Sequence, residues 1–284
     1  MINLHALNDI YPSAQWRIIK TPPAIGAWNM AVDEAILEAV GHREALPTLR
    51  LFAWEPPCLS LGYAQPVSDV DRRNLAKHGW DLVRRPTGGR AILHTDELTY
   101  SVVGQSDEPR LVGGVLESYR RLAQALLEAL HRLGLPAEAN LEEPATVSKT
   151  APGPVCFEIP STYEITVHQR KLIGSAQARR KEGVLQHGSL PLQGDLARIT
   201  QVLNFSSEDE RQQASERLHG RAVTVQEFLG NPVSWETAAE AFRGAFAQVL
   251  NLELLPCELT SAELIRAAEL VRDKYNHPSW TERI

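Results

Sequence analysis

Apolar and polar residues follow helical spacing near the start of the chain and strand-like spacing after it. The stretch 26–40 places Trp28, Ala31, Ala35, Ile36 and Ala39 on one side and the acidic Asp33, Glu34 and Glu38 on the other. Runs rich in strand-forming residues follow at 48–54, 80–94 and 97–103, separated by prolines and glycines. This pattern predicts one amphipathic helix and then a sheet.

The middle of the chain predicts a second helix, a hairpin and a further strand. An apolar stripe over 116–133 is helical, and Gly134 stands where a left-handed residue would end it. The alternation in 161–177 continues on both sides of a polar turn, which indicates a hairpin, and 183–192 is the next strand. The segment 134–155 holds many proline, glycine and small polar residues, so we expect a mobile loop that leads to Cys156.

The C-terminal third has mostly helical signals. Thr224 with Glu227, and Thr260 with Glu263, have the spacing of a capping box. Between these pairs, 235–250 has a helical pattern. This end of the chain is therefore predicted to be mostly helix.

Composition excludes several classes of protein. The 284 residues are 43% hydrophobic and 23% charged, which is typical of a soluble globular protein, and a net charge of −6 argues against a general nucleic-acid binder. The three cysteines, Cys58, Cys156 and Cys257, are too few for a disulfide framework and form no zinc motif, so we assign no metal. With no leader and no apolar run able to cross a bilayer, we expect a cytoplasmic protein without a membrane partner.

The stretch "RRPTGGRAILH" raises the first question about chemistry. Gly88 and Gly89 either form an ordinary turn between strands or let the backbone approach a ligand that side chains would block. Arg84, Arg85 and Arg90 crowd this turn, and cations at strand ends favour an anionic partner.

A lysine and a cysteine are the candidate reactive groups. Lys171 precedes Gly174, Ser175 and Ala176, which are small enough to let a substrate lie against the strand. Lys171 is either solvated or a charge that holds a carbonyl oxygen, and the residues alone leave both open. Cys156, after the expected loop, is either a small buried residue or a nucleophile.

Two histidines lie in strand-like sequence. His94 and His187 are each either structural or a base for Cys156, to which Lys171 could also contribute. Neither histidine has metal-ligand spacing to another residue.

Taken together, these motifs resemble the biotin/lipoate protein ligase superfamily. The stretches "RRPTGGRAILH", "ELTYSV" and "RKLIGSAQARRKEGVLQHGSLPL" carry the likeness, with "GAWNMAVDEAIL" and "LSLGYAQ" before them, and together they cover most of 16–250. The resemblance implies an α/β fold with a mixed, largely antiparallel sheet flanked by helices. It implies one acyltransferase domain over 1–284, with a catalytic core at about 16–220 and a helical segment at about 221–284 packed on it.

Within the superfamily, the sequence is similar to octanoyltransferases of the LipM type. Lipoate-protein ligases usually carry a third glycine where Arg90 stands and an Asn-Asp pair before the lysine strand, and both are missing here. The segment "CFEIPS" instead resembles the acyl-accepting cysteine of the LipM type, which implies that Cys156 takes octanoyl from acyl carrier protein and passes it to a lipoyl-domain lysine. Acceptors of this kind are the glycine cleavage H protein and 2-oxoacid dehydrogenase E2.

The resemblance also implies roles for individual residues. Cys156 and Lys171 are catalytic, no cofactor is needed, and the protein is expected to be a monomer. The apolar stretches 61–63 and 172–173 are expected to receive the octanoyl chain. The substrate-binding residues are Arg84, Gly88, Gly89, Arg90, His94, Gly174, Ser175, Ala176 and His187.

Three other functions stay open at this point. An ATP-dependent lipoate ligase would need ATP and magnesium and would tolerate Cys156→Ser. A noncatalytic binder of lipoyl domains would keep the fold without turnover. An amidotransferase that moves octanoyl between lipoyl proteins would use similar cysteine chemistry.

Overall fold

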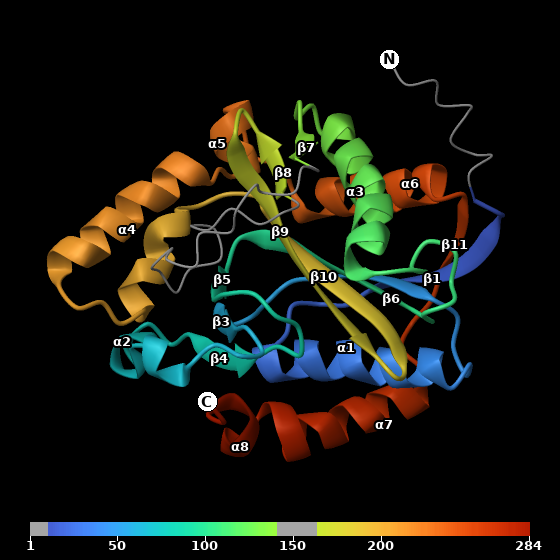
Figure 1. The fold of residues 1–284 in the computed structure, drawn as a ribbon, viewed down its shortest axis with the longest axis horizontal. Helices are drawn as coiled ribbons and strands as arrows, with labels where there is room; N and C mark the ends of the chain where they lie inside the picture. The colour runs from blue at the N-terminus through green and yellow to red at the C-terminus, as the bar shows by residue number, and fades with distance from the viewer. Residues whose placement is uncertain (1–10, 141–163) are drawn as a thin grey trace.

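A mixed sheet crosses the middle of the molecule, and helices cover both of its faces (Figure 1). The structure is a computed structural model that describes residues 11–140 and 164–284. Its strands are β1 (Ala14–Lys20), β2 (Thr48–Phe52), β3 (Cys58–Leu61), β4 (Asp81–Arg84), β5 (Ile92–His94), β6 (Glu97–Gly104), β7 (Glu138–Asn140), β8 (Glu164–Val167), β9 (Arg170–Arg180), β10 (Gly183–Pro191) and β11 (Leu252–Pro256). Its helices are α1 (Gly26–Gly41), α2 (Arg72–Lys77), α3 (Val115–Arg132), α4 (Glu208–Arg221), α5 (Val225–Leu229), α6 (Trp235–Val249), α7 (Ser261–Leu270) and α8 (Pro278–Thr281).

The large sheet is mostly antiparallel. Within the described residues its order is β11-β1-β2-β6-β10-β9-β8-β7, and a smaller sheet has the order β4-β3-β5. In the large sheet β1 runs parallel to β11 and β2, whereas every pair from β2 to β7 is antiparallel. The predicted fold class is therefore confirmed.

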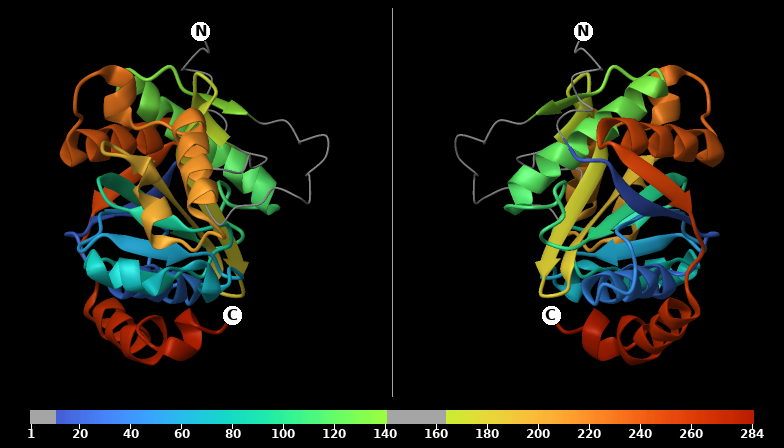
Figure 2. Two further views of the ribbon diagram at one scale, coloured as in Figure 1. Left: turned by 90° about the vertical axis from the view of Figure 1, so that its left-hand side faces the viewer. Right: turned by 90° about the vertical axis from the view of Figure 1, so that its right-hand side faces the viewer.

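Helices pack against the sheet in separate layers. In Figure 1, α3 and α6 lie on one side of the sheet and α1 on the other, with α7 outside α1; Figure 2 shows the same layers from both ends. Apolar faces of α3 and α6 join Trp16, Leu51 and Tyr100 of the sheet in one core, and α1 forms a second core with Phe52 and Leu270.

Local sequence signals correctly predicted several boundaries. The helix α3 ends just before Gly134, which has a φ of +83°. The hairpin turn between β8 and β9 consists of His168 and Gln169, both with positive φ, as a two-residue turn between twisted strands requires. Thr224 caps α5, and Thr260 forms the predicted capping box with Glu263.

The acidic residues of α1 are covered by other parts of the protein. Asp33 is completely buried. Glu34 forms an ion pair with Lys274, and Glu38 forms one with Arg266 of α7. The C-terminal helical segments, more than 200 residues along the chain, pair with Glu34 and Glu38, whereas Asp33 faces Arg50 of β2.

Part of the expected loop lies outside the described residues. Residues 138–140 of the segment 134–155 form β7, whereas 141–155 and Cys156 fall in the range that the structure does not describe. No helix among the described residues is long and apolar enough to cross a membrane.

Candidate active site

A partly enclosed cavity lies where the small sheet meets the middle strands of the large one. Its walls come from the start of α1, the glycine loop and strands of both sheets. The lining residues are Met30, Trp54, Ser60, Arg85, Gly89, Ile92, His94, Thr99, Gly174, Ser175, Ala176, His187, Gly188 and Ser189.

The structure brings together most of the substrate-binding residues expected from the sequence. The residues of that group that line the cavity are Gly89, His94, Gly174, Ser175, Ala176 and His187. Gly88 lines an open hollow next to the cavity, and Gly89 borders both. Arg90 is half-buried next to this loop and is absent from the lining of either space.

The apolar wall of the cavity differs from the expected one. Met30, Trp54 and Ile92 form it. Residues 172–173 are buried in the core of the large sheet, and Leu61 is buried under the small sheet. The expectation that Leu61, Leu172 and Ile173 receive an alkyl chain is therefore corrected, because packing within the protein already occupies their side chains. Tyr63 is 43% exposed and lines the hollow beside the cavity.

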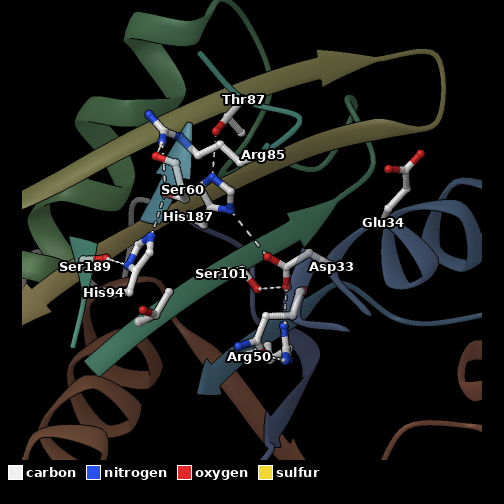
Figure 3. Close-up of polar contacts among 12 residues, drawn as sticks. Asp33, Glu34, Arg50, Ser60, Arg85, Thr87, His94, Ser101, His187 and Ser189 are labelled. Atoms are coloured by element: carbon white, nitrogen blue, oxygen red, sulfur yellow. Dashed lines mark hydrogen bonds and ion pairs between the residues drawn. The ribbon is translucent and has the colours of Figure 1, made fainter. Parts of the chain in front are cut away.

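The first polar feature of the cavity is a hydrogen-bonded chain from Ser60 through His94 to Glu97. The Ser60 Oγ lies 2.7 Å from His94 Nε2 (Figure 3). On the other side of the ring, His94 Nδ1 lies 2.7 Å from Glu97 Oε1. A carboxylate only accepts hydrogen bonds, so His94 Nδ1 carries a proton and donates it to Glu97. Trp54 stacks on the imidazole with 3.9 Å between ring centroids, which fixes the plane of the ring.

Glu97 is held as a carboxylate by its neighbours. Burial alone would raise its pKa, but the pKa is lowered because His94 and the hydroxyls of Thr99 and Ser189 favour the charged form. The carboxylate therefore orients His94 towards the cavity.

A second chain of the same kind runs from Thr87 through His187 to Asp33. The Thr87 Oγ1 lies 2.7 Å from His187 Nε2, and His187 Nδ1 faces Asp33 Oδ2 at 3.4 Å (Figure 3). Asp33 also forms an ion pair of 2.8 Å with Arg50 and accepts a hydrogen bond from Ser101. This chain connects the glycine loop to the buried charges between α1 and β2.

We expect His187 to make stability depend on pH. Burial lowers its pKa below 6.5, against the opposing effect of Asp33, so the folded protein binds a proton there less readily than the unfolded chain. The contribution of neutral His187 to the free energy of unfolding is fully present above about pH 6.5. It is lost as the pH drops through the lower pKa of the folded state. The free energy of unfolding of His187→Gln, measured by urea titration from pH 5 to 8, should vary less with pH than that of the wild type. An unchanged profile would contradict this assignment.

The expectation that Arg84 serves an anionic partner is corrected, because its donors are used within the protein. The Arg84 side chain is completely buried. Its guanidinium donates to the backbone carbonyls of Gly62, Tyr63, Gln65, Trp280 and Thr281. It therefore ties the C-terminal segment to the loop after β3.

Arg85 holds the glycine loop from inside. Its guanidinium donates to the carbonyls of Ser60, Gly88 and Arg90. The loop also approaches Gly62 closely, because a Cβ at Gly62 would lie 1.8 Å from the carbonyl oxygen of Gly89. The adjacent glycines thus reflect a close backbone packing as well as a cavity border.

Lys171 lies on β9, three residues before the cavity residue Gly174. Only 4% of it is exposed, and its ammonium forms an ion pair of 3.0 Å with Glu164. It is absent from the cavity lining. Within the ranges 11–140 and 164–284, no group of residues has the arrangement of a metal site.

Sequence reasoning missed Ser60, Glu97 and the ion pair of Asp33 with Arg50. One signal was present: Arg50 stands in the middle of the apolar run "TLRLF", and a buried guanidinium requires a carboxylate or carbonyl partner. Nothing in the sequence specified which carboxylate.

Comparison with known proteins places this fold and cavity in a lipoylation family. Residues 26–247 match the lipoyl protein ligase A/B catalytic domain. Octanoyltransferase LipM of Brevibacillus brevis is 40% identical over 95% of this chain and 99% of its own length, and that of Kyrpidia tusciae is 42% identical over 94% and 98%.

Solved structures agree with this placement. A bipartite lipoate protein ligase from Thermoplasma acidophilum is similar with a TM-score of 0.78 and 25% identity, covering 94% of this chain and 96% of that one. A lipoate-protein ligase A bound with ATP has a TM-score of 0.75 and 26% identity, covering 95% and 99%. The chain therefore belongs to the lipoyl protein ligase A/B catalytic-domain family. Within that family its curated relatives are LipM octanoyltransferases.

Proposed function

We propose that this protein is an acyltransferase of protein lipoylation that moves octanoyl from octanoyl-acyl carrier protein to a lysine of a lipoyl domain. The observation that carries the proposal is the match to LipM octanoyltransferases over nearly the whole chain. The cavity supports it, since an apolar wall and small residues along β9 and β10 suit an alkyl chain.

In the first half-reaction, the Cys156 thiolate attacks the thioester carbonyl of the donor. A bond forms between Sγ and the acyl carbon, and the bond from that carbon to the donor sulfur breaks. The donor leaves as a thiolate, which takes up a proton to replace the one that Cys156 lost. The reaction exchanges one thioester for another, so it is close to neutral in free energy and needs no ATP.

In the second half-reaction, the lysine amine of the lipoyl domain attacks the octanoyl-Cys156 thioester. The amide bond forms, the bond between carbon and Sγ breaks, and the amine loses a proton while the cysteine is regenerated. An amide is more stable than a thioester, which makes this step favourable. The glycine cleavage H protein and 2-oxoacid dehydrogenase E2 are the acceptors that this proposal names.

The cavity residues have supporting roles in this scheme. The backbone of Gly88 and Gly89 borders the acyl group, and Met30, Trp54 and Ile92 contact the alkyl part of the octanoyl group. Each buried methylene contributes about 0.8 kcal/mol, which favours octanoyl over acetyl. His94, oriented by Glu97, presents a basic nitrogen to Ser60 at the cavity wall.

The test is the dependence of lipoyl-domain modification on the acyl source. Purified protein is mixed with a lipoyl domain and octanoyl-acyl carrier protein without ATP, and intact masses are recorded. The proposal expects an octanoylated lipoyl domain under these conditions. Modification that occurs only with free octanoate or lipoate, ATP and magnesium would make the protein a ligase and overturn the proposal.

Lys171→Ala is expected to lower octanoyl transfer by about 100-fold, since a single positioned donor to a developing oxyanion contributes about 3 kcal/mol. The Lys171 ammonium, now paired with Glu164, would supply that charge at the acyl carbonyl. Single-turnover rates of Cys156 acylation measure the effect. Glu164→Gln is the matched control, because it removes the ion pair and keeps the Lys171 ammonium. If Glu164→Gln slows acylation as much as Lys171→Ala does, the ion pair and not the ammonium alone is required, which would contradict this role.

A further inference from the structure

An open hollow of about 620 Å³ adjoins the cavity at the glycine loop. One side consists of Tyr63, Pro86, Gly88 and Gly89, and the other is the end of the β9–β10 hairpin, residues 177–182. Gly89 lines both spaces, so the hollow and the cavity meet at the glycine loop. A Cβ added at Gly88 would contact nothing within 4 Å, so the glycine loop faces open space on the side of the hollow.

The hairpin side of the hollow is basic. Arg179, Arg180 and Lys181 line it, against one acidic lining residue, Glu182. Arg179 is occupied within the protein, because it donates to Ser118 and to the carbonyl of Leu111. Arg180 and Lys181 form no ion pair with any residue in the described part of the chain.

The positive field extends across the hollow to Tyr63. A hydrogen bond from Arg283 and its charge lower the pKa of the Tyr63 phenol, and Arg180 and Lys274 lower it further. The Arg283 guanidinium lies 3.7 Å from the centre of the Tyr63 ring. In a protein with a net charge of −6, this is a local site where a negative group is attracted.

We propose that Arg180 and Lys181 bind the phosphate of a 4′-phosphopantetheine arm, and that the arm crosses Gly88 and Gly89 to deliver its thioester to the cavity. The proposal rests on the proposed function, since it identifies the part of the acyl donor that the hollow recognises. In this proposal Arg180 and Lys181 bind the anion that the sequence analysis expected near Arg84 and Arg85. The guanidiniums of Arg84 and Arg85 donate to backbone carbonyls of the protein.

Two small donors that differ only by the phosphate test the proposal directly. Octanoyl-4′-phosphopantetheine and octanoyl-pantetheine are each mixed with the protein, and the second-order rate constant of octanoyl adduct formation is measured by intact mass. We expect the phosphorylated donor to react about tenfold faster or more, as hydrogen bonds to a charged group imply. In the variant Arg180→Gln with Lys181→Gln, the ratio of the two constants should fall to about one.

Two further variants make the test specific. Lys181→Gln alone, at an exposed position, should give an intermediate ratio. The control is Arg211→Gln with Arg243→Gln, which removes the same charge from α4 and α6, where each arginine pairs with a glutamate of its own helix. The control should keep the wild-type ratio.

The possible failures are distinguishable. Equal rate constants for the two donors in the wild type, or a ratio that survives in the double variant, would overturn the phosphate site. If the double variant instead loses rate only with intact octanoyl-acyl carrier protein, the cations contact the carrier surface and the phosphate proposal is wrong. If the wild type forms no adduct with any of these donors, the proposed function itself fails.

Discussion

Cys156→Ala is expected to abolish the octanoyl adduct and to lower octanoyl transfer at least about 1,000-fold, because the scheme has no other group to hold the acyl chain between its two steps. Intact mass spectrometry after mixing with octanoyl-acyl carrier protein should show an adduct on the wild type that hydroxylamine removes. The adduct should be missing from the variant.

The two other cysteines provide the controls for this experiment. Cys257 is half-buried and lies away from the cavity lining, so Cys257→Ala should acylate at the wild-type rate. Cys58 is completely buried, and this burial raises the pKa of its thiol well above the usual value, which makes it a poor nucleophile. An adduct that persists in Cys156→Ala would assign the nucleophile to another residue.

Asp33→Ala is expected to lower the free energy of unfolding by about 3–5 kcal/mol, since it leaves the Arg50 guanidinium buried without its carboxylate. Both side chains have 0% exposure, and their ion pair is 2.8 Å long. Burial opposes ionisation of Asp33, but Arg50 and His187 outweigh it and lower its pKa below 3.8. The stabilisation is therefore present at neutral pH and is lost only as the pH falls below about 3.8.

Urea unfolding at pH 7 measures this effect, and the same helix offers a matched control. Glu38→Ala removes a carboxylate from the half-exposed pair with Arg266, so its cost should stay below about 1 kcal/mol. The double variant Asp33→Ala with Arg50→Met should recover part of the stability, because no unpaired charge remains. A cost for Asp33→Ala no greater than that for Glu38→Ala would contradict this account of the ion pair.

The sequence determined the elements whose signals are local. The helix α3 and its glycine end, the hairpin turn at His168 and Gln169, and the cap at Thr260 each depend on residues within a few positions of one another. The family was also predictable, because its motifs are contiguous stretches, and the comparisons confirm it.

Only the tertiary structure decided how the charges are used. Arg84 and Arg85 resembled ligand-binding cations in the sequence, but the fold supplies backbone carbonyls from distant segments to both of them. The sequence did not indicate the partner of Asp33, which β2 supplies as Arg50. A buried charge is stable only beside its partner, and the partner is chosen by which segments the sheet brings together, which the local pattern does not specify. The hydrogen-bonded chain of Ser60, His94 and Glu97 joins three separate strands, so it too depends on which segments the fold brings together.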